Sequence, residues 1–418
     1  MSTAFRVILE GTQEVPPNNS TASGFGTVIF DSTAVAASYT FNIEGVDYGP
    51  ILGQPAQTPT VNDDDVTSMH FHNEVRGEIG PIVFGQINPA HDADDLAIDL
   101  NADGSWTVSG TWETTDPANV PITNFATILG TAPVGAEIPI YFNVHTVEFP
   151  EGEIRGQLVA ISDDNNNVVT GTAEDDLLPG LGGNDIVTGL EGDDTIQGGD
   201  GDDVLLGNEG NDDINTGAGN DFVVAGDGND TIGGMAGKDI VLAGEGDDQV
   251  IWNDPTGDVV YGDDGNDFLR GGDAAADTIA GGNGNDFLRA VANPSLATHA
   301  SDALFGENGN DVISGGNAAD TIEGGAGSDI LSGLGGADQF VFRALPGDPT
   351  TPDSDQITDF VTGEDTVVLN GFGADFDPLE NLSAGSTGAV LDLGDSGQVV
   401  FLGRLTNEFT AGDFLVIA

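Results

Sequence analysis

A nine-residue repeat constrains what this chain can fold into more than any other feature of its sequence. From Gly171 to Ile251 the chain divides into nine consecutive units without a gap. The sixth residue of every unit is Asp and the eighth is aliphatic, and the fourth is Gly in eight of the nine, Glu174 being the exception. Three columns fixed at one period indicate a single supersecondary unit stacked many times.

The same Asp-x-aliphatic signal continues in nine further units, although its spacing lengthens near 252–257 and again near 290–301. We expect a loop or kink at these places, between two regular blocks of one repeat region at 171–341. The Asp column comprises Asp176, Asp185, Asp194, Asp203, Asp212, Asp221, Asp230, Asp239, Asp248, Asp258, Asp267, Asp277, Asp286, Asp302, Asp311, Asp320, Asp329 and Asp338.

The form of the unit, Gly-Gly-x-Gly-x-Asp-x-aliphatic-x, predicts a sharp turn followed by a minimal strand. Glycine allows the positive backbone dihedrals that a six-residue turn requires. The aliphatic residue, with outward-facing neighbours, makes a three-residue strand. Two units complete one coil of eighteen residues, so Asp185 is expected to lie one rung, about 4.8 Å, from Asp203.

Stacked carboxylates require a counterion. The chain carries 71 acidic and 8 basic residues, for a net charge of −63, and two carboxylates about 5 Å apart repel by roughly 3 kcal/mol at an effective dielectric of 20. Calcium accepts six to eight oxygen ligands in flexible geometry, whereas magnesium demands a tighter octahedron. We therefore predict calcium on the Asp column, with on the order of seven sites in the first block.

Composition also limits the partners of the protein. The acidic excess disfavours binding to nucleic acid and to anionic membranes. The sequence contains no run of eighteen apolar residues, so we expect no membrane insertion. The start, MSTAFRVILEGTQEVPP, is unlike a Sec-type signal peptide. Hydrolase motifs such as His-Glu-x-x-His and Gly-x-Ser-x-Gly do not occur.

The repeats closely resemble the repeats-in-toxin, or hemolysin-type, calcium-binding family. GADQFVF, DQITDF and GEDTVVL within 336–369 look like the segment that closes the calcium roll of serralysin-type proteases, and the terminal DFLVIA is similar to the uncleaved signal of type I exporters. The resemblance implies a parallel β-roll at 171–341, a C-terminal cap with secretion signal at 342–418, the type I secretion machinery as a partner, and a secreted protein that folds on calcium outside the cell.

Residues 1–161 differ from the repeats in character. Short alternating runs such as FRVILE, ASYTFNI and IYFNVHT predict an antiparallel β-sandwich, and 162–170 reads as a polar linker. LEGTQEVPP, MHFHNEVRGEIGP and YFNVHTVEFPEGEIRGQL together resemble the chordin-type (CHRD) domain family. The fold class expected for the whole chain is therefore all-β.

Four histidines of this region form a second candidate metal site. His70 and His72 alternate along one strand and so share a face, and His145 from a later strand, with His91, could complete a copper or zinc site. This arrangement is loosely similar to copper-zinc superoxide dismutases. The alternative interpretation is that these histidines only hydrogen-bond nearby turns.

Two functions follow from these patterns. The first is a non-enzymatic, calcium-binding structural or adhesive protein of the bacterial surface or extracellular matrix, which contacts cell-surface components or assembles with itself into a filament, layer or matrix. The second is a metal-dependent oxidoreductase, superoxide-dismutase-like, centred on His70, His72 and His145.

Overall fold

The computed structural model describes residues 2–14, 17–52, 64–87, 95–102, 104–114, 121–234, 236–252, 255–272, 274–291, 300–344 and 353–417. They form two compact units, Met1–Val169 with Pro179–Gly183, and Thr170–Leu178 with Asn184–Ala418. Both units are built almost entirely of strands, which confirms the all-β class. No helix in the described ranges is long and apolar enough to cross a membrane.

The first unit is one antiparallel sheet of nine strands in the order β5-β4-β8-β9-β1-β2-β3-β7-β6. Its elements are β1 (Ser2–Glu10), η1 (Gly11–Gln13), β2 (Ser23–Asp31), β3 (Ala36–Glu44), β4 (Val66–His72), β5 (Ile82–Ile87), β6 (Ala97–Leu100), β7 (Trp106–Trp112), η2 (Ile122–Asn124), α1 (Ala126–Thr131), β8 (Glu137–Thr146) and β9 (Ile154–Asp163).

Aromatic contacts show that this sheet curls on itself. Phe41 of β3 stacks on Phe142 of β8 with ring centroids 4.1 Å apart, although β9, β1 and β2 separate these strands in the sheet. Tyr39 of β3 likewise meets Phe71 of β4 at 5.8 Å. The two facing layers of the expected sandwich are thus two halves of one curved antiparallel sheet, which encloses the aromatic core.

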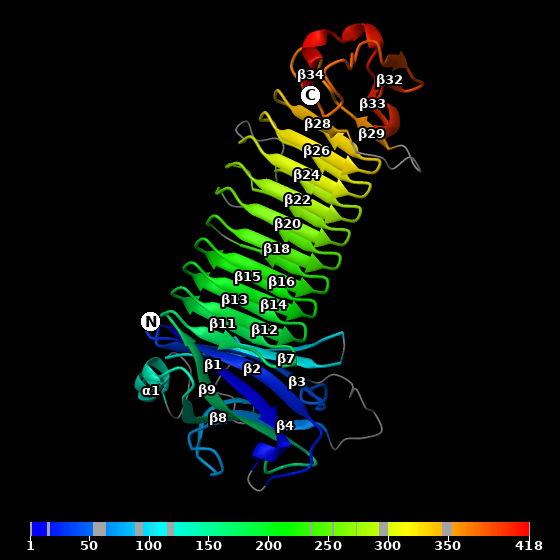
Figure 1. The fold of residues 1–418 in the computed structure, drawn as a ribbon. Coiled ribbons are helices and arrows are strands. Elements are labelled where there is room, and N and C mark those ends of the chain that lie inside the picture. Colours follow the sequence, from blue (N-terminus) through cyan, green and yellow to red (C-terminus); the bar gives the residue numbers. More distant parts are fainter. Residues whose placement is uncertain are drawn as a thin grey trace. The chain divides into compact units, whose positions relative to one another are not determined.

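The second unit is a parallel β-solenoid, in which two sheets run along the stack of coils (Figure 1). One sheet contains β10 (Val168–Thr170), β12 (Ile186–Glu191), β14 (Val204–Glu209), β16 (Phe222–Asp227), β18 (Ile240–Glu245), β20 (Val259–Asp264), β22 (Thr278–Asn283), β24 (Ala303–Asn308), β26 (Thr321–Ala326), β28 (Gln339–Arg343), β30 (Thr366–Asn370) and β34 (Phe414–Ile417). We call it the long-strand sheet.

The opposite sheet contains β11 (Leu177–Gly182), β13 (Thr195–Asp200), β15 (Asp213–Ala218), β17 (Thr231–Gly233), β19 (Gln249–Ile251), β21 (Phe268–Arg270), β23 (Phe287–Arg289), β25 (Val312–Ser314), β27 (Ile330–Ser332), β29 (Ser354–Ile357), β33 (Gln398–Leu402), β32 (Gly388–Asp392) and β31 (Leu382–Ala384). Val187 pairs with Leu205 and Ile196 with Ile214, each eighteen residues on. The repeat aliphatics, Val187 and Leu205 among them, are fully buried between the sheets.

Both sheets run without interruption through the two irregular spacings. Val241 pairs with Val260 across nineteen residues, and Ile279 pairs with Leu304 across twenty-five. The strand pairing therefore continues across both spacings and does not divide the roll into the two blocks that the sequence suggested. Residues 253–254 and 292–299, within the two predicted interruptions, lie outside the described residues.

The C-terminal segment closes the solenoid with further strands of the same sheets. β30 and β34 continue the long-strand sheet in parallel, whereas β33 pairs in parallel with β29 and then antiparallel with β32. Phe360 contacts Phe401 at 5.2 Å, and Phe401 contacts Phe409 at 4.8 Å. These rings cover the apolar end of the roll interior.

Candidate metal centres

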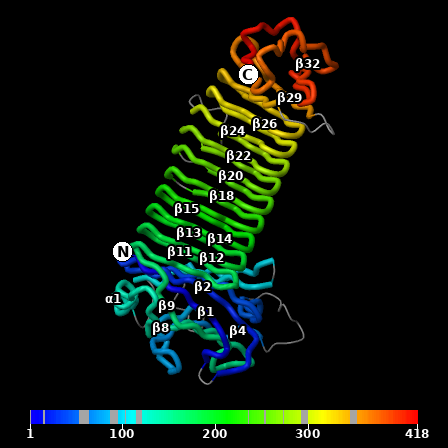
Figure 2. Tube along the Cα trace, in the orientation of Figure 1, coloured from blue at the N-terminus to red at the C-terminus, as the bar shows by residue number. Residues whose placement is uncertain are grey.

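Along two edges of the solenoid the chain turns from one sheet to the other (Figure 2). The aspartates of the repeat end these turns. The turns that lead into the odd-numbered strands from β13 to β27 form one edge, which we call the first edge. Each of these turns ends in an aspartate: Asp194, Asp212, Asp230, Asp248, Asp267, Asp286, Asp311 and Asp329. The turns that lead into the even-numbered strands from β12 to β28 form the second edge. They end in Asp185, Asp203, Asp221, Asp239, Asp258, Asp277, Asp302, Asp320 and Asp338.

One oxygen of each repeat carboxylate holds consecutive rungs together. Oδ1 of Asp212 accepts a hydrogen bond from the backbone N–H of Asp194, eighteen residues earlier, at 2.8 Å. On the second edge Oδ1 of Asp221 accepts from the N–H of Asp203 at 2.8 Å. The carboxylates are buried along both columns. The structure therefore brings the predicted aspartates together edge by edge, each one rung from the next.

Among the residues that the structure describes, the second carboxylate oxygen, Oδ2, has no hydrogen-bond partner along the first edge. It is buried and unpartnered at Asp194, Asp212, Asp230, Asp248, Asp267, Asp286, Asp311 and Asp329. A buried charged oxygen without a partner is strongly unfavourable unless a counterion is present. This column of oxygens is the main observation for a cation site.

The surroundings of these oxygens suit a hard cation. At Gly207, which begins the turn of Asp212, a Cβ atom would meet Asp212 Oδ2 at 2.1 Å and the carbonyl oxygen of Ala225 at 2.4 Å. A carboxylate oxygen and a carbonyl oxygen from successive rungs thus converge beside the turn. Oxygen donors of these two kinds are the ligands that calcium prefers, so the residues present fit calcium.

Burial raises the pKa values of many of the repeat carboxyls when no cation is bound. It raises the pKa of Asp194 and of Asp248 to about 7, with neighbouring aspartates adding to the effect. The pKa of Asp302, on the second edge, is raised to about 8 for the same reasons. Backbone hydrogen bonds act in the opposite direction but are outweighed.

Two aspartates of the cap extend these columns and were missed in the sequence. Oδ1 of Asp355 accepts from the N–H of Asp329 at 3.0 Å, and Oδ1 of Asp365 accepts from that of Asp338 at 3.1 Å. Both begin an Asp-x-aliphatic triplet, Asp-Gln-Ile and Asp-Thr-Val. The triplet identifies them, but the nine-residue spacing does not, because Asp355 and Asp365 follow their partners on the preceding rung by 26 and 27 residues.

A histidine cluster occupies the first unit. His70 and His72 of β4 and His145 of β8 are brought together so that one ligand atom of each lies within 4.8 Å of the others. His70 Nδ1, His72 Nε2 and His145 Nε2 are buried and have no hydrogen-bond partner in the described part of the chain. The fourth predicted ligand, His91, lies outside the described residues.

The other ring nitrogens of the cluster are fixed by the backbone. His72 Nδ1 lies 2.7 Å from the carbonyl of Gly80 and His145 Nδ1 lies 3.1 Å from that of Pro150, so each donates its N–H and leaves Nε2 with a lone pair. Burial lowers the pKa of His70 to about 3 and that of His72 to about 4. The neutral rings meet the requirement for metal-binding imidazoles.

Both interpretations of these histidines therefore have a basis in the structure. The turn contacts at Gly80 and Pro150 match the structural alternative, and the three unpartnered nitrogens that converge match a copper or zinc site with an open fourth position. The hydrogen bonds and the metal site are compatible, since they use different nitrogens of the same rings.

Two family models match the chain, and they adjoin. A CHRD domain model matches residues 5–158. A model of four copies of the RTX calcium-binding nonapeptide repeat matches at 161–196, 188–223, 215–250, 254–288 and 304–340. No curated protein matches the chain.

Proposed function

The chain carries a CHRD domain followed by RTX calcium-binding nonapeptide repeats, and from this we propose that it is a secreted structural or adhesive protein of the bacterial surface or extracellular matrix. In this proposal the solenoid folds on calcium after export and supports the CHRD domain. The observation that carries it is the column of buried, unpartnered Oδ2 atoms on the first edge. Such a column favours an unfolded chain where calcium is scarce and a folded one where calcium is plentiful.

Export by a type I system is part of the proposal. Proteins with RTX repeats are typically exported, and the terminal DFLVIA resembles the signal that type I exporters read. A chain that stays unfolded without calcium is also suited to threading through a transporter. The cap and its phenylalanine cluster would then fold outside the cell together with the solenoid.

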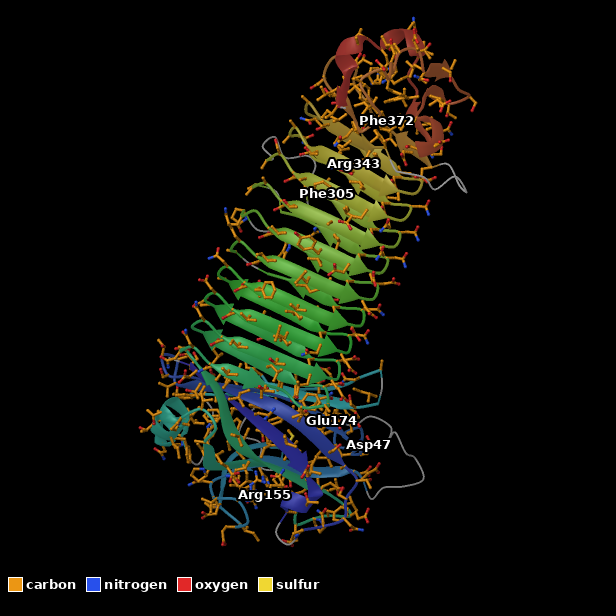
Figure 3. All side chains as sticks on the ribbon, in the orientation of Figure 1. Asp47, Arg155, Glu174, Phe305, Arg343 and Phe372 are labelled. Atoms are coloured by element: carbon orange, nitrogen blue, oxygen red, sulfur yellow. The ribbon has the colours of Figure 1, made fainter. Side chains whose placement is uncertain are left out.

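Self-assembly is supported by the outer face of the long-strand sheet. Ile186, Phe222 and Ile240 lie in one column, joined in register through Val204, and are 43%, 38% and 43% exposed. A second column holds Leu206, Val224, Leu242 and Tyr261 and leads to Phe305, labelled in Figure 3. An exposed apolar face of this kind marks an interaction surface.

We propose a second copy of the chain as its occupant. The same eighteen-residue repeat sets the spacing of apolar rows on both copies, so the two faces match rung for rung. The net charge of −63 keeps copies apart until cations neutralise the edges. Association should therefore require calcium.

The assembly proposal predicts calcium-dependent sedimentation. In millimolar calcium we expect the full chain to sediment as a dimer or larger species, and the double variant Phe222→Ser, Ile240→Ser to remain monomeric, because it removes two exposed side chains at the centre of the face. Thr231→Ser, on the opposite sheet, is the control. Wild-type protein that is fully calcium-bound and monomeric at high concentration would exclude this assembly.

A metal-dependent redox function is the second candidate, supported by the three converging imidazole nitrogens of the histidine cluster. Copper or zinc bound there would have three nitrogen ligands and one open position, which is the arrangement of catalytic metal sites. Tyr141 stacks on His72 at 4.7 Å and holds the ring in place. The cluster residues would orient the metal, and copper, unlike redox-inert zinc, would supply the electron transfer.

This candidate predicts one tightly held copper or zinc ion per chain. With calcium saturating, we expect His145→Gln to lower the affinity of the full chain for copper by at least tenfold, because three nitrogen ligands become two. His299→Gln, a histidine of the repeat region, is the matched control, and His91→Gln tests the fourth predicted ligand. Equal copper binding by wild type and His145→Gln in dialysis would assign these histidines to turn stabilisation alone.

A further inference from the structure

The two edges of the solenoid differ in the fourth residue of their turns. On the first edge this residue is always glycine: Gly192, Gly210, Gly228, Gly246, Gly265, Gly284, Gly309 and Gly327. On the second edge the glycines end at Gly237, and Thr256, Ala275, Ala300 and Ala318 follow before Gly336. The repeat is therefore regular along one edge and irregular along much of the other.

The fourth glycine fixes the path of the turn. Gly246 has φ +136°, and a Cβ there would lie 1.9 Å from the carbonyl oxygen of Gly228 on the preceding rung. Thr256, Ala275 and Ala318 do not adopt a positive φ. The backbone at these positions therefore differs in φ from the first-edge turns, although a Cβ on Gly336 would still lie 2.0 Å from the carbonyl oxygen of Ala318, much as at Gly246.

Two carboxylates of the irregular turns bond differently from those of the first edge. Oδ2 of Asp277 accepts a hydrogen bond from the backbone N–H of Gly272 at 2.9 Å, and Oδ2 of Asp320 accepts from that of Gly316 at 2.6 Å. Each donor belongs to the same turn as its acceptor. The oxygen that is unpartnered at every first-edge aspartate is thus satisfied by the protein itself at these two positions.

A buried tryptophan marks where the irregular part begins. A Cβ on Gly234, the first residue of the Asp239 turn, would lie 2.3 Å from the ring of Trp252 and 2.3 Å from Thr216 Oγ1. At the equivalent Gly207 of the first edge, the same direction leads to a carboxylate oxygen. Trp252 is fully buried, and Thr216 Oγ1 donates to Asp239 Oδ2 at 3.4 Å. The ring and the hydroxyl fill this space.

We propose that calcium binds the two edges unequally. The first edge holds cations along its whole length, from Asp194 to Asp329. The second edge holds them near Asp203 and Asp221, whose Oδ2 atoms are unpartnered, but not at Asp239, Asp277 and Asp320. At Asp239, Asp277 and Asp320 the second edge is closed without calcium, by Thr216 and Trp252 at the first and by the N–H groups of Gly272 and Gly316 at the other two. This inference rests on the calcium binding proposed above.

Matched variants of the full chain test the proposal by counting bound calcium. Asp248→Asn on the first edge and Asp320→Asn on the second both keep an oxygen at the Oδ1 position and both remove one charge. We expect Asp248→Asn to lose at least one bound ion per chain in equilibrium dialysis followed by elemental analysis, and Asp320→Asn to bind as many ions as wild type. Loss of the same number of ions from both variants would overturn the inequality of the edges.

A second measurement uses only the wild-type protein, so it tests the proposal even if one of the variants does not fold. Wild-type crystals soaked with terbium, which occupies calcium sites, should give anomalous peaks between successive first-edge turns and none beside Trp252, Asp277 or Asp320. Peaks along the whole second edge would overturn the proposal. If wild-type protein bound no calcium in dialysis, calcium binding itself would fail, and this result differs from equal loss in the two variants.

Discussion

Chelation of calcium at pH 8 is expected to unfold the solenoid of the full chain while the first unit stays folded. In hydrogen exchange, amide protection should disappear from strands between Ile186 and Ser332 and persist in β1, β8 and β9. The physical reason is the first-edge column, because eight buried Oδ2 atoms lack partners and an uncompensated buried charge costs several kcal/mol. The first unit has its own aromatic core and does not depend on these carboxylates.

The same experiment has a defined pH dependence. Without cation the folded-state pKa of Asp194, Asp221 and Asp248 is about 7, raised by burial above the reference value of 3.8. The folded state then binds more protons than the unfolded state, so stability is gained as pH falls through 7 and lost as pH rises through it. Acidifying the chelated protein from pH 8 to pH 5 should restore part of the protection.

The control is the calcium-loaded protein, which should be equally protected at pH 8 and pH 6.5 because the bound cation keeps the carboxylates ionised. Identical protection of β13 to β27 with and without chelator at pH 8 would contradict the calcium requirement. Loss of protection in β1, β8 and β9 on chelation would instead show that the first unit depends on the solenoid.

The repeat columns were sufficient to predict the solenoid because each has one physical role. The aliphatic column, including Val187 and Leu205, is buried between parallel strands that pair at an offset of eighteen residues. Alternation along β4 correctly placed His70 and His72 on one face, and the β4–β8 pairing then brought His145 to them. These predictions needed only local pattern and period.

Features that depend on long-range closure were not predicted. Alternating strands are the same in a sandwich and in one curled sheet, so the contact of Phe41 with Phe142 could not be read from the sequence. The Thr216, Gly234 and Trp252 arrangement joins residues eighteen apart, and its effect on the space near Asp239 appears only when rungs are stacked. Ala275 and Ala318 replace the repeat glycine in the sequence itself. The prediction of calcium used only the aspartates, and it therefore did not distinguish the two edges.

Gly228→Ala is expected to cause a large loss of solenoid stability in saturating calcium. Gly228 has φ +137°, and the new Cβ would lie 1.9 Å from the carbonyl oxygen of Gly210. A left-handed conformation costs a non-glycine residue about 1–2 kcal/mol, and overpacking typically adds about 1–3 kcal/mol. We therefore expect a decrease of about 2–5 kcal/mol in the free energy of unfolding, measured by denaturant titration.

Gly233→Ala is the matched control for this substitution. Gly233 lies outside the left-handed φ range, and the nearest neighbour to a new Cβ is the carbonyl oxygen of Ile251 at 3.4 Å, an ordinary van der Waals contact. The change should alter stability by less than about 1 kcal/mol, since alanine is tolerated where the glycine conformation is not required. Gly228 and Gly233 lie five residues apart in the same coil and differ in whether another rung's backbone occupies the Cβ position. Equal losses from both variants would therefore show that the glycine column does not hold the first edge in its observed path.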